Sequence, residues 1–270
     1  MSSPNLVSIE SLSHPALEPY FRIRERDLVG RQGCFVAEGE VVVRVLLASR
    51  RHRVRSLLVE RRRVPAIADA LAALGPEVPV LVVPQAVMDK ATGFSIHRGI
   101  LALGERPPDV SVSELALRPG PVVALVGLTN HDNVGGIFRN AAAFGAAGVV
   151  LDDATCDPLY RKAIRVSAGA ALVVPFARAG SAEMLLDALA GAGVVPIALT
   201  PRGDETIAAV GQSLARTARA ALVLGTEGPG LPDDVLARCR RVRIPMVAGF
   251  DSLNVAAASA IALHEMSGLR

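Results

Sequence analysis

The sequence predicts an α/β protein built around a parallel sheet and preceded by a smaller α/β domain. Hydrophobic residues occupy 51% of the 270 positions, so the chain can bury a sizeable core, and with only 3% aromatic residues that core must be aliphatic. From residue 122 onward, stretches rich in Val, Leu and Ala alternate with helical patterns, as in parallel strands joined by helices. The scarcity of aromatic rings argues against binding of single-stranded nucleic acid by base stacking.

The first part of the chain predicts the smaller domain. Short apolar runs indicate strands at residues 35–37, 54–59, 78–83 and 99–103, with helices at residues 40–48 and 64–74. The stretch from Gly104 to Pro108 ends in paired prolines, which hold the backbone extended as linkers do. The predicted organisation is a first domain at 1–105, a linker at 106–120 and a second domain at 121–270.

The second domain shows a regular alternation of strands and helices. Strands are expected at residues 122–126, 148–151, 171–175, 194–199, 220–224 and 241–244. Helices are expected at residues 134–144, 159–168, 182–190, 232–239 and 253–265. Such a pattern predicts a parallel sheet with helices on both faces, in which ligands bind in loops at the carboxyl ends of the strands.

The basic residues are concentrated in the first domain. Residues 1–108 carry 15 Lys and Arg against 11 Asp and Glu. All but two of the 29 basic residues in the chain are Arg, whose guanidinium can bind a phosphate through two N–H groups. Arg-rich runs at residues 50–55 and 61–63 predict either a solvated face or a footprint for a phosphate backbone. Genomic codon bias explains the preference for Arg equally well.

The cysteines, the histidines and the apolar runs indicate the compartment. Cys34, Cys156 and Cys239 lie far apart and the five His lack metal-ligand spacing, so we expect a reduced, metal-free protein. The N-terminus has no signal pattern, and Arg, Gly or Pro interrupts each apolar run before it reaches membrane-spanning length. The expectation is a cytoplasmic protein with no membrane partner.

Two polar segments follow predicted strands of the second domain. The first begins at Asn130 and carries Arg139 on a helix that Asp132 or Asn133 could cap; alone, it is typical of a capped helix with an exposed Arg. The second, residues 224–231, has three glycines that allow a ligand to approach the backbone, and it matches neither a P-loop nor a dinucleotide fingerprint. Its carboxylate, Glu227, favours a ligand without phosphates, such as a nucleoside that carries positive charge. A plain glycine turn is the alternative.

A third polar segment precedes the last helix. Asp251 or Ser252 is expected to cap that helix. Asn254 is a poor helix former in apolar surroundings, so it is expected to have a hydrogen-bonding partner.

Together the three segments resemble the SpoU/TrmH family of SPOUT RNA 2′-O-ribose methyltransferases. The resemblance rests on three family motifs, which correspond here to Asn133-Val134-Gly135 with Arg139, to Leu224 through Leu231, and to Ile244-Pro245-Met246 with Asp251 through Ala256. Residues 165–170 also resemble a family segment, whereas Thr226 departs from the Asn of many members. Residues 35–40 and 97–102 resemble the ribosomal-protein-like RNA-binding domain that many members carry.

The resemblance implies a fold, an assembly and an activity. The fold is a parallel-sheet SPOUT domain with a C-terminal trefoil knot, a feature that topology rules alone would reject. Members are usually homodimers with the active site near the interface, and the alanine-rich last helix is one candidate contact. The implied activity is metal-free methyl transfer from S-adenosylmethionine to a ribose 2′-hydroxyl in RNA. The two-domain layout favours rRNA over tRNA as the substrate.

The resemblance also implies site residues. Eight residues are implied to bind the cofactor: Leu224, Gly225, Thr226, Gly230, Ile244, Pro245, Met246 and Leu253. Five are implied to serve catalysis: Arg139, Asn133, Glu227, Ser252 and Asn254. Because a guanidinium stays protonated in proteins, Arg139 is expected to stabilise the developing oxyanion or a phosphate rather than accept a proton.

The other catalytic residues are implied to support Arg139 and the ribose. Asn133 is expected to orient Arg139, Ser252 and Asn254 to hold the ribose or Arg139, and Glu227 to hold the glycine loop. The alternative functions are tRNA methylation and a non-catalytic RNA-binding relative. The presence of Arg139, Ser252 and Asn254 weighs against the latter.

Overall fold

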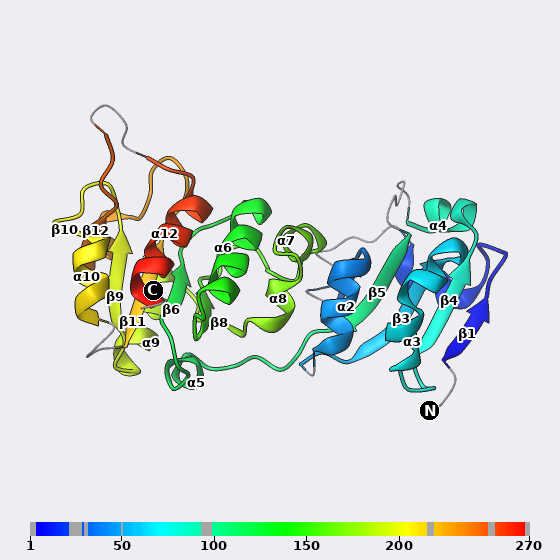
Figure 1. The fold of residues 1–270 in the computed structure, drawn as a ribbon. Coiled ribbons are helices and arrows are strands. Elements are labelled where there is room, and N and C mark those ends of the chain that lie inside the picture. The colour runs from blue at the N-terminus through cyan, green and yellow to red at the C-terminus, as the bar shows by residue number, and fades with distance from the viewer. Residues whose placement is uncertain are drawn as a thin grey trace. The chain divides into compact units, whose positions relative to one another are not determined.

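The structure is a computed structural model that describes residues 4–21, 29, 32–49, 51–92, 99–214, 219–247 and 252–267 (Figure 1). The chain divides into two compact units. The first comprises residues 1–107 and 159–173, and the second comprises residues 108–158 and 174–270. The excursion of residues 159–173 into the first unit was not expected from the sequence. None of the helices in the described ranges is both long and apolar enough to cross a membrane.

The first unit is a five-stranded mixed sheet. Its strand order is β1 (Asn5–Ser8), β4 (Pro79–Val83), β3 (Val54–Glu60), β5 (Ile100–Glu105) and β2 (Cys34–Glu38). β5 runs antiparallel to β3 and β2, and the other pairs are parallel. Its helices are η1 (Pro15–Tyr20), α2 (Glu40–Ala48), η2 (Arg61–Ile67), α3 (Ala68–Ala72), α4 (Gln85–Thr92), α7 (Arg161–Val166) and α8 (Ala170–Val173).

Buried polar contacts hold residues 159–173 in this unit. The Glu38 carboxylate on β2 is 3.6 Å from the Arg161 guanidinium and 3.9 Å from that of Arg165, both on α7. The ring nitrogens of His52 lie 3.1 Å from the backbone oxygen of Glu105 and 3.0 Å from that of Leu172. Charge pairing of Glu38 and hydrogen bonding of His52 therefore offset the contacts with water that these side chains lose on burial.

The second unit is a seven-stranded sheet, and all of its strand pairs are parallel. The strand order is β10 (Glu205–Thr206), β12 (Arg240–Arg243), β9 (Val195–Leu199), β11 (Ala220–Leu224), β6 (Val122–Leu125), β7 (Gly148–Leu151) and β8 (Phe176–Arg178). The helices are α5 (Val112–Ala116), α6 (His131–Ala143), α9 (Ala182–Gly191), α10 (Ile207–Leu214), α11 (Asp233–Ala237) and α12 (Val255–Ser267). The expected parallel α/β sheet is confirmed.

One predicted strand, at residues 171–175, is wrong. Ala168 and Gly169 adopt positive φ values of 52° and 88°, and this turn starts the short helix α8 over residues that read as an apolar strand. Pro175 has no backbone N–H to give to a ladder, so β8 begins one residue later, at Phe176. The stretch predicted as a linker carries α5, whose Val112, Leu115 and Ala116 belong to the core of the second unit.

The caps of the two helices next to the site also differ from expectation. α6 starts at His131, and Asn130, rather than Asp132 or Asn133, accepts from the backbone N–H of Asp132 at 2.9 Å. At the start of α12, Asn254 Oδ1 accepts from the N–H groups of Ala256 and Ala257 at 2.9 and 3.2 Å, so it caps the helix in place of Ser252. The other expected cap, Asp251, lies outside the described residues.

Candidate active site

A pocket opens at the carboxyl ends of three neighbouring strands of the second unit, β9, β11 and β12. Four segments line it, and they contribute Leu199, Thr200, Pro201, Leu224, Gly225, Thr226, Glu227, Gly228, Gly230, Leu231, Ile244, Met246, Ser252, Leu253, Val255 and Ala258. Most of these side chains are apolar, and a few polar groups converge among them. This composition, at this edge of a parallel sheet, is typical of a small-molecule site.

The glycine loop after β11 forms one wall of the pocket. A Cβ on Gly225 would lie 2.7 Å from backbone atoms of Gly230 and Leu231, so this position has room only for glycine. Gly228 and Gly230 adopt positive φ values of 84° and 76°. The Thr226 hydroxyl donates to the backbone oxygen of Gly230 at 3.3 Å and closes the loop. Thr226 therefore contributes a side-chain contact within the loop.

Three of the expected catalytic residues meet beside the pocket, and we call Asn133, Glu227 and Asn254 the amide cluster. Asn133 Nδ2 donates to Glu227 Oε1 at 2.8 Å. Asn254 Nδ2 donates to the same carboxylate oxygen and to Asn133 Oδ1, both at 2.9 Å. Asn133 is buried whereas the other two are exposed. The cluster joins α6, the glycine loop and the start of α12, and the expectation of a partner for Asn254 is confirmed.

A close approach of two helices supports the amide cluster. α6 and α12 lie side by side (Figure 1), and a Cβ on Gly136 would lie 2.8 Å from the Cβ of Ala256. One turn further along α6, Asn140 Nδ2 donates to the Ala256 backbone oxygen at 2.7 Å and to the Ser259 hydroxyl at 2.9 Å. Asn133, Gly136 and Asn140 therefore form one stripe of α6 that faces α12.

The structure does not bring all the expected site residues to the pocket. Seven of the eight expected cofactor residues line it, and Pro245 does not; Ser252 and Glu227 are lining residues as well. Arg139 is exposed on α6, is not among the lining residues, and makes no hydrogen bond or ion pair with the residues that the structure describes. Of the five expected catalytic residues, Glu227 and Ser252 thus line the pocket, whereas Arg139 does not.

Sequence reasoning missed Thr200, Pro201 and Asn140. Thr200 and Pro201 directly follow β9, so the rule that ligands bind beyond the carboxyl ends of parallel strands could have found them. For Asn140 the signal was an amide four residues after Gly136 and seven after Asn133, which places all three on one face of the predicted helix. Its partners lie 116 and 119 residues away in the chain and are not visible in a local pattern.

The three cysteines lie outside the lining of the pocket. Burial raises the pKa of the Cys156 and Cys239 thiols to about 11, and it raises that of Cys34 as well. These thiols are therefore protonated at neutral pH and are poor nucleophiles. In the described ranges, moreover, no group of three or more His, Cys, Asp and Glu side chains is arranged to hold a metal ion.

Three arginines of the two basic runs in the first unit form ion pairs that the structure describes. Arg55 bonds Glu105 at 2.7 Å, Arg61 bonds Glu10, and Arg62 approaches Glu60 at 3.3 Å. Arg44 on α2 bridges to Asp69 at 2.8 Å. Ion pairing of this kind lowers the net charge that these runs present to a polyanion, although exposed pairs are individually weak.

The fold is shared with solved RNA methyltransferases. An rRNA methyltransferase from Sinorhizobium meliloti, solved with bound AdoMet, gives a TM-score of 0.78 at 25% identity, with 97% of each chain covered. A structure described as an RNA 2′-O ribose methyltransferase gives a TM-score of 0.73 at 26% identity, over 96% of this chain and 98% of the other. The fold and the site together define an RNA methyltransferase.

Sequence similarity gives the family. An uncharacterized tRNA/rRNA methyltransferase from Mycobacterium bovis is 41% identical over 248 residues, which is 90% of this chain and 83% of the relative. A profile of the SpoU rRNA Methylase family matches residues 120–264. The chain belongs to the SpoU rRNA Methylase family, and the resemblance of the three polar segments is confirmed.

Proposed function

We propose that this protein transfers a methyl group from S-adenosylmethionine to a ribose 2′-hydroxyl in RNA, with rRNA favoured over tRNA. The observation that carries the proposal is the pocket beyond β9, β11 and β12, lined by the residues that the family motifs supply. The solved relatives that bind AdoMet and act on ribose support it, and so does the two-unit layout.

The residues of the pocket fit S-adenosylmethionine. Leu224, Ile244 and Leu253 offer apolar surface to an adenosine, and the glycine loop offers backbone without side chains close by. The Glu227 carboxylate suits a ligand with a positive sulfonium charge. When bound, the cofactor supplies a methyl group that its sulfonium activates for transfer.

The side chains around the pocket position the reacting groups and stabilise the charge that develops during transfer. The amide cluster holds the glycine loop and the start of α12 in register with α6. The permanently charged Arg139 stabilises the developing oxyanion or the phosphate next to the reacting ribose. Ser252, on the pocket wall, has a hydroxyl that can hold the ribose.

A homodimer would complete the site. Arg139 lies outside the lining of the pocket of its own chain, so a second copy is the natural source of that guanidinium. Ile261 on α12 is 41% exposed and offers apolar surface for such a contact. We also propose that the C-terminal segment is threaded as a trefoil knot, that the first unit binds RNA, and that the protein acts in the cytoplasm.

The experiment is methyl transfer to RNA from a strain that lacks the gene. Ribosomal and transfer RNA are separated, treated with wild-type protein and labelled cofactor, and the modified riboses are mapped. Label in ribosomal RNA is expected. Label confined to tRNA would favour the second candidate substrate, and RNA binding without any label would favour a non-catalytic relative.

The role of Arg139 is tested in the same assay. Arg139→Ala should abolish methyl transfer while S-adenosylmethionine binding survives, and Arg118→Ala, which removes another exposed guanidinium, should leave both unchanged. Wild-type turnover by Arg139→Ala would overturn the assignment. A monomer by light scattering at micromolar concentration would overturn the dimer.

A further inference from the structure

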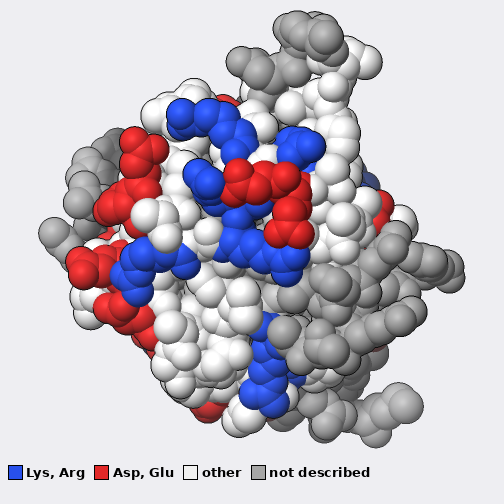
Figure 2. Space-filling model, turned by 90° about the vertical axis from the view of Figure 1, so that its left-hand side faces the viewer, with Lys and Arg blue, Asp and Glu red and all other residues white. Residues whose placement is uncertain are grey.

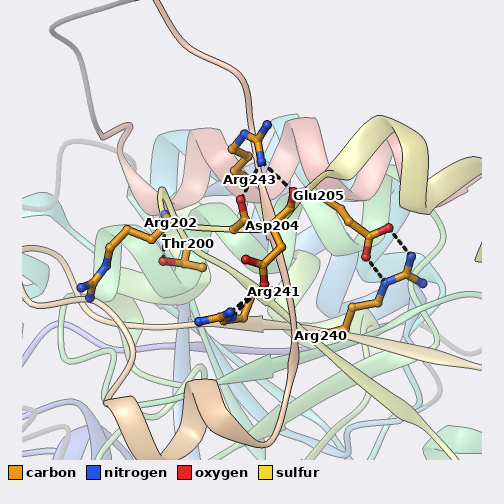
Figure 3. A network of polar contacts seen from close by, with 8 residues as sticks. Thr200, Arg202, Asp204, Glu205, Arg240, Arg241 and Arg243 are labelled. Atoms are coloured by element: carbon orange, nitrogen blue, oxygen red, sulfur yellow. Dashed lines mark hydrogen bonds and ion pairs between the residues drawn. The ribbon is translucent and has the colours of Figure 1, made fainter.

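Beside the pocket, the sheet edge at β10 and β12 carries a group of arginines. Figure 2 faces this end of the second unit and shows basic side chains gathered there with acidic ones among them. The group consists of four arginines, Arg202, Arg240, Arg241 and Arg243, and two carboxylates, Asp204 and Glu205 (Figure 3). The formal charge of this group is therefore positive.

Two of the four guanidiniums are already occupied by carboxylates. The Nε and Nη2 atoms of Arg240 donate to the two oxygens of Glu205 at 2.7 and 2.6 Å. The same two atoms of Arg241 donate to Asp204 Oδ2 at 3.0 and 2.8 Å. In both residues the two N–H donors that could bind a phosphate are already bonded to a carboxylate.

Arg243 has a different arrangement. Its Nη1 donates to the backbone oxygens of Gly203 and Asp204 at 2.6 and 3.0 Å. These bonds orient the guanidinium, while its Nε and Nη2 donors bond no carboxylate in the described part of the chain. Arg202 is exposed, and its side chain points away from Asp204 in Figure 3, with no carboxylate partner among the described residues.

A rigid turn holds these two arginines next to the pocket. A Cβ on Gly203 would lie 2.2 Å from the backbone carbon of Val242, so the turn presses directly on β12. The backbone N–H groups of Thr200 and Asp204 donate to Val242 and Arg241 on β12 at 2.9 and 3.2 Å. Arg202 follows Pro201, and Arg243 precedes Ile244, and both of those neighbours line the pocket.

We propose that Arg202 and Arg243 bind backbone phosphates of the RNA substrate beside the methyl-transfer site. The inference rests on the proposed function, and it names residues that grip this RNA. A polyanion suits two oriented guanidiniums whose phosphate-binding forks are unfilled, since phosphate contacts fix the register of a nucleic acid without reading its sequence. Arg240 and Arg241 contribute no such contact, because Glu205 and Asp204 already bind their guanidiniums.

The test is RNA affinity measured apart from turnover. End-labelled, protein-free ribosomal RNA fragments are titrated with the full chain by fluorescence anisotropy over a range of salt concentrations. One phosphate contact contributes about 0.7 (single strands) to about 0.9 (B-DNA) to the slope of log K against log salt, or about five- to eight-fold in affinity at about 0.1 M salt relative to 1 M. Arg202→Ala and Arg243→Ala should each lose about that much.

Arg240→Ala is the matched control, because it removes the same charge from the same strand but from a guanidinium that Glu205 already fills. It should change affinity less than about two-fold. Equal losses in Arg240→Ala and Arg243→Ala would overturn the proposal, because net charge alone would then explain them. Arg202→Ala provides a second test should Arg243→Ala disturb the turn, since the Arg202 side chain has no bond to the turn in the described residues.

Cofactor binding and methyl transfer complete the test. An unchanged RNA affinity together with a weaker affinity of Arg243→Ala for S-adenosylmethionine would also overturn the proposal, because the guanidinium would then serve the cofactor. Wild-type protein that binds RNA with the expected slope but transfers no methyl would refute the proposed function and leave the phosphate contacts supported. Wild-type protein that binds no RNA would overturn both.

Discussion

Gly136 on α6 tests whether the close approach of α6 and α12 builds the site. In Gly136→Ala the new Cβ would lie 2.8 Å from that of Ala256, whereas carbon atoms in ordinary contact are about 3.5–4.0 Å apart. α12 must therefore retreat by about 1 Å. Such overpacking costs about 1–3 kcal/mol, against about 1 kcal/mol gained from the better helix propensity of Ala. We expect destabilisation of up to about 2 kcal/mol.

The displacement of α12 should also weaken cofactor binding. Ala256 lies two residues after Asn254, whose amide joins Asn133 and Glu227, so cofactor affinity should fall several-fold. Denaturant unfolding and calorimetric titration with S-adenosylmethionine measure the two effects. Ala256→Gly makes room for the new methyl group, so the double variant should recover both properties, with a coupling energy of about 1 kcal/mol or more.

Additive effects of Gly136→Ala and Ala256→Gly would refute this reasoning. So would a Gly136→Ala protein that is more stable than wild type and binds the cofactor normally. Gly191→Ala is the matched control, because that helical position has open space around it and a substitution there gains propensity without a clash.

Three further predictions concern the loop, a buried histidine and a buried hydroxyl. Gly225→Ala places a Cβ 2.7 Å from backbone of the glycine loop and should weaken cofactor binding at least ten-fold by calorimetry; unchanged binding would show that the loop yields easily. Burial lowers the pKa of His52, so the unfolded chain takes up a proton below about pH 6.5 that the folded chain resists. The free energy of unfolding is therefore expected to be largest above that pH and to fall as the pH drops to 5. His52→Gln should flatten this dependence in denaturant titrations, and identical profiles for wild type and His52→Gln would contradict it. Tyr20→Phe removes the 2.8 Å hydrogen bond to the buried Ser56 hydroxyl and should cost about 1–2 kcal/mol in unfolding free energy; no measurable loss would mean that Ser56 finds another partner.

The sequence predicted a helix or strand correctly where the local hydrophobic pattern fitted only one of the two. Residues 40–48 form α2 as expected, because an apolar face recurs at helical spacing between two strands. The pattern failed at residues 171–175, where an apolar run is equally consistent with helix and strand, and where the turn at Ala168 and Gly169 and the proline at 175 decide.

The site could be predicted in part for the same reason. The motifs located the pocket walls, since Gly225 and Ile244 directly follow strands that end at one edge of the sheet. The sequence also showed that Asn254 needs a partner. It could not show that the partners are Asn133 and Glu227, because those contacts join residues 121 and 27 positions away, and they depend on how the segments pack. The corrected helix caps, by contrast, are local, because Asn130 and Asn254 accept from backbone N–H groups only two or three residues along the chain.

The central claim is transfer of a methyl group to a ribose 2′-hydroxyl, and the chemistry of alkaline hydrolysis tests it directly. Base cleaves RNA through attack of the 2′-hydroxyl on the adjacent phosphate, so a methylated ribose protects its own linkage. RNA from a strain without the gene is incubated with the protein and S-adenosylmethionine labelled in its methyl group, and it is then hydrolysed completely in alkali. The proposal predicts that the label runs as an alkali-resistant dinucleotide and that Arg139→Ala yields none. Label in mononucleotides, which would place the methyl group on a base, or no label in any RNA fraction, would contradict it.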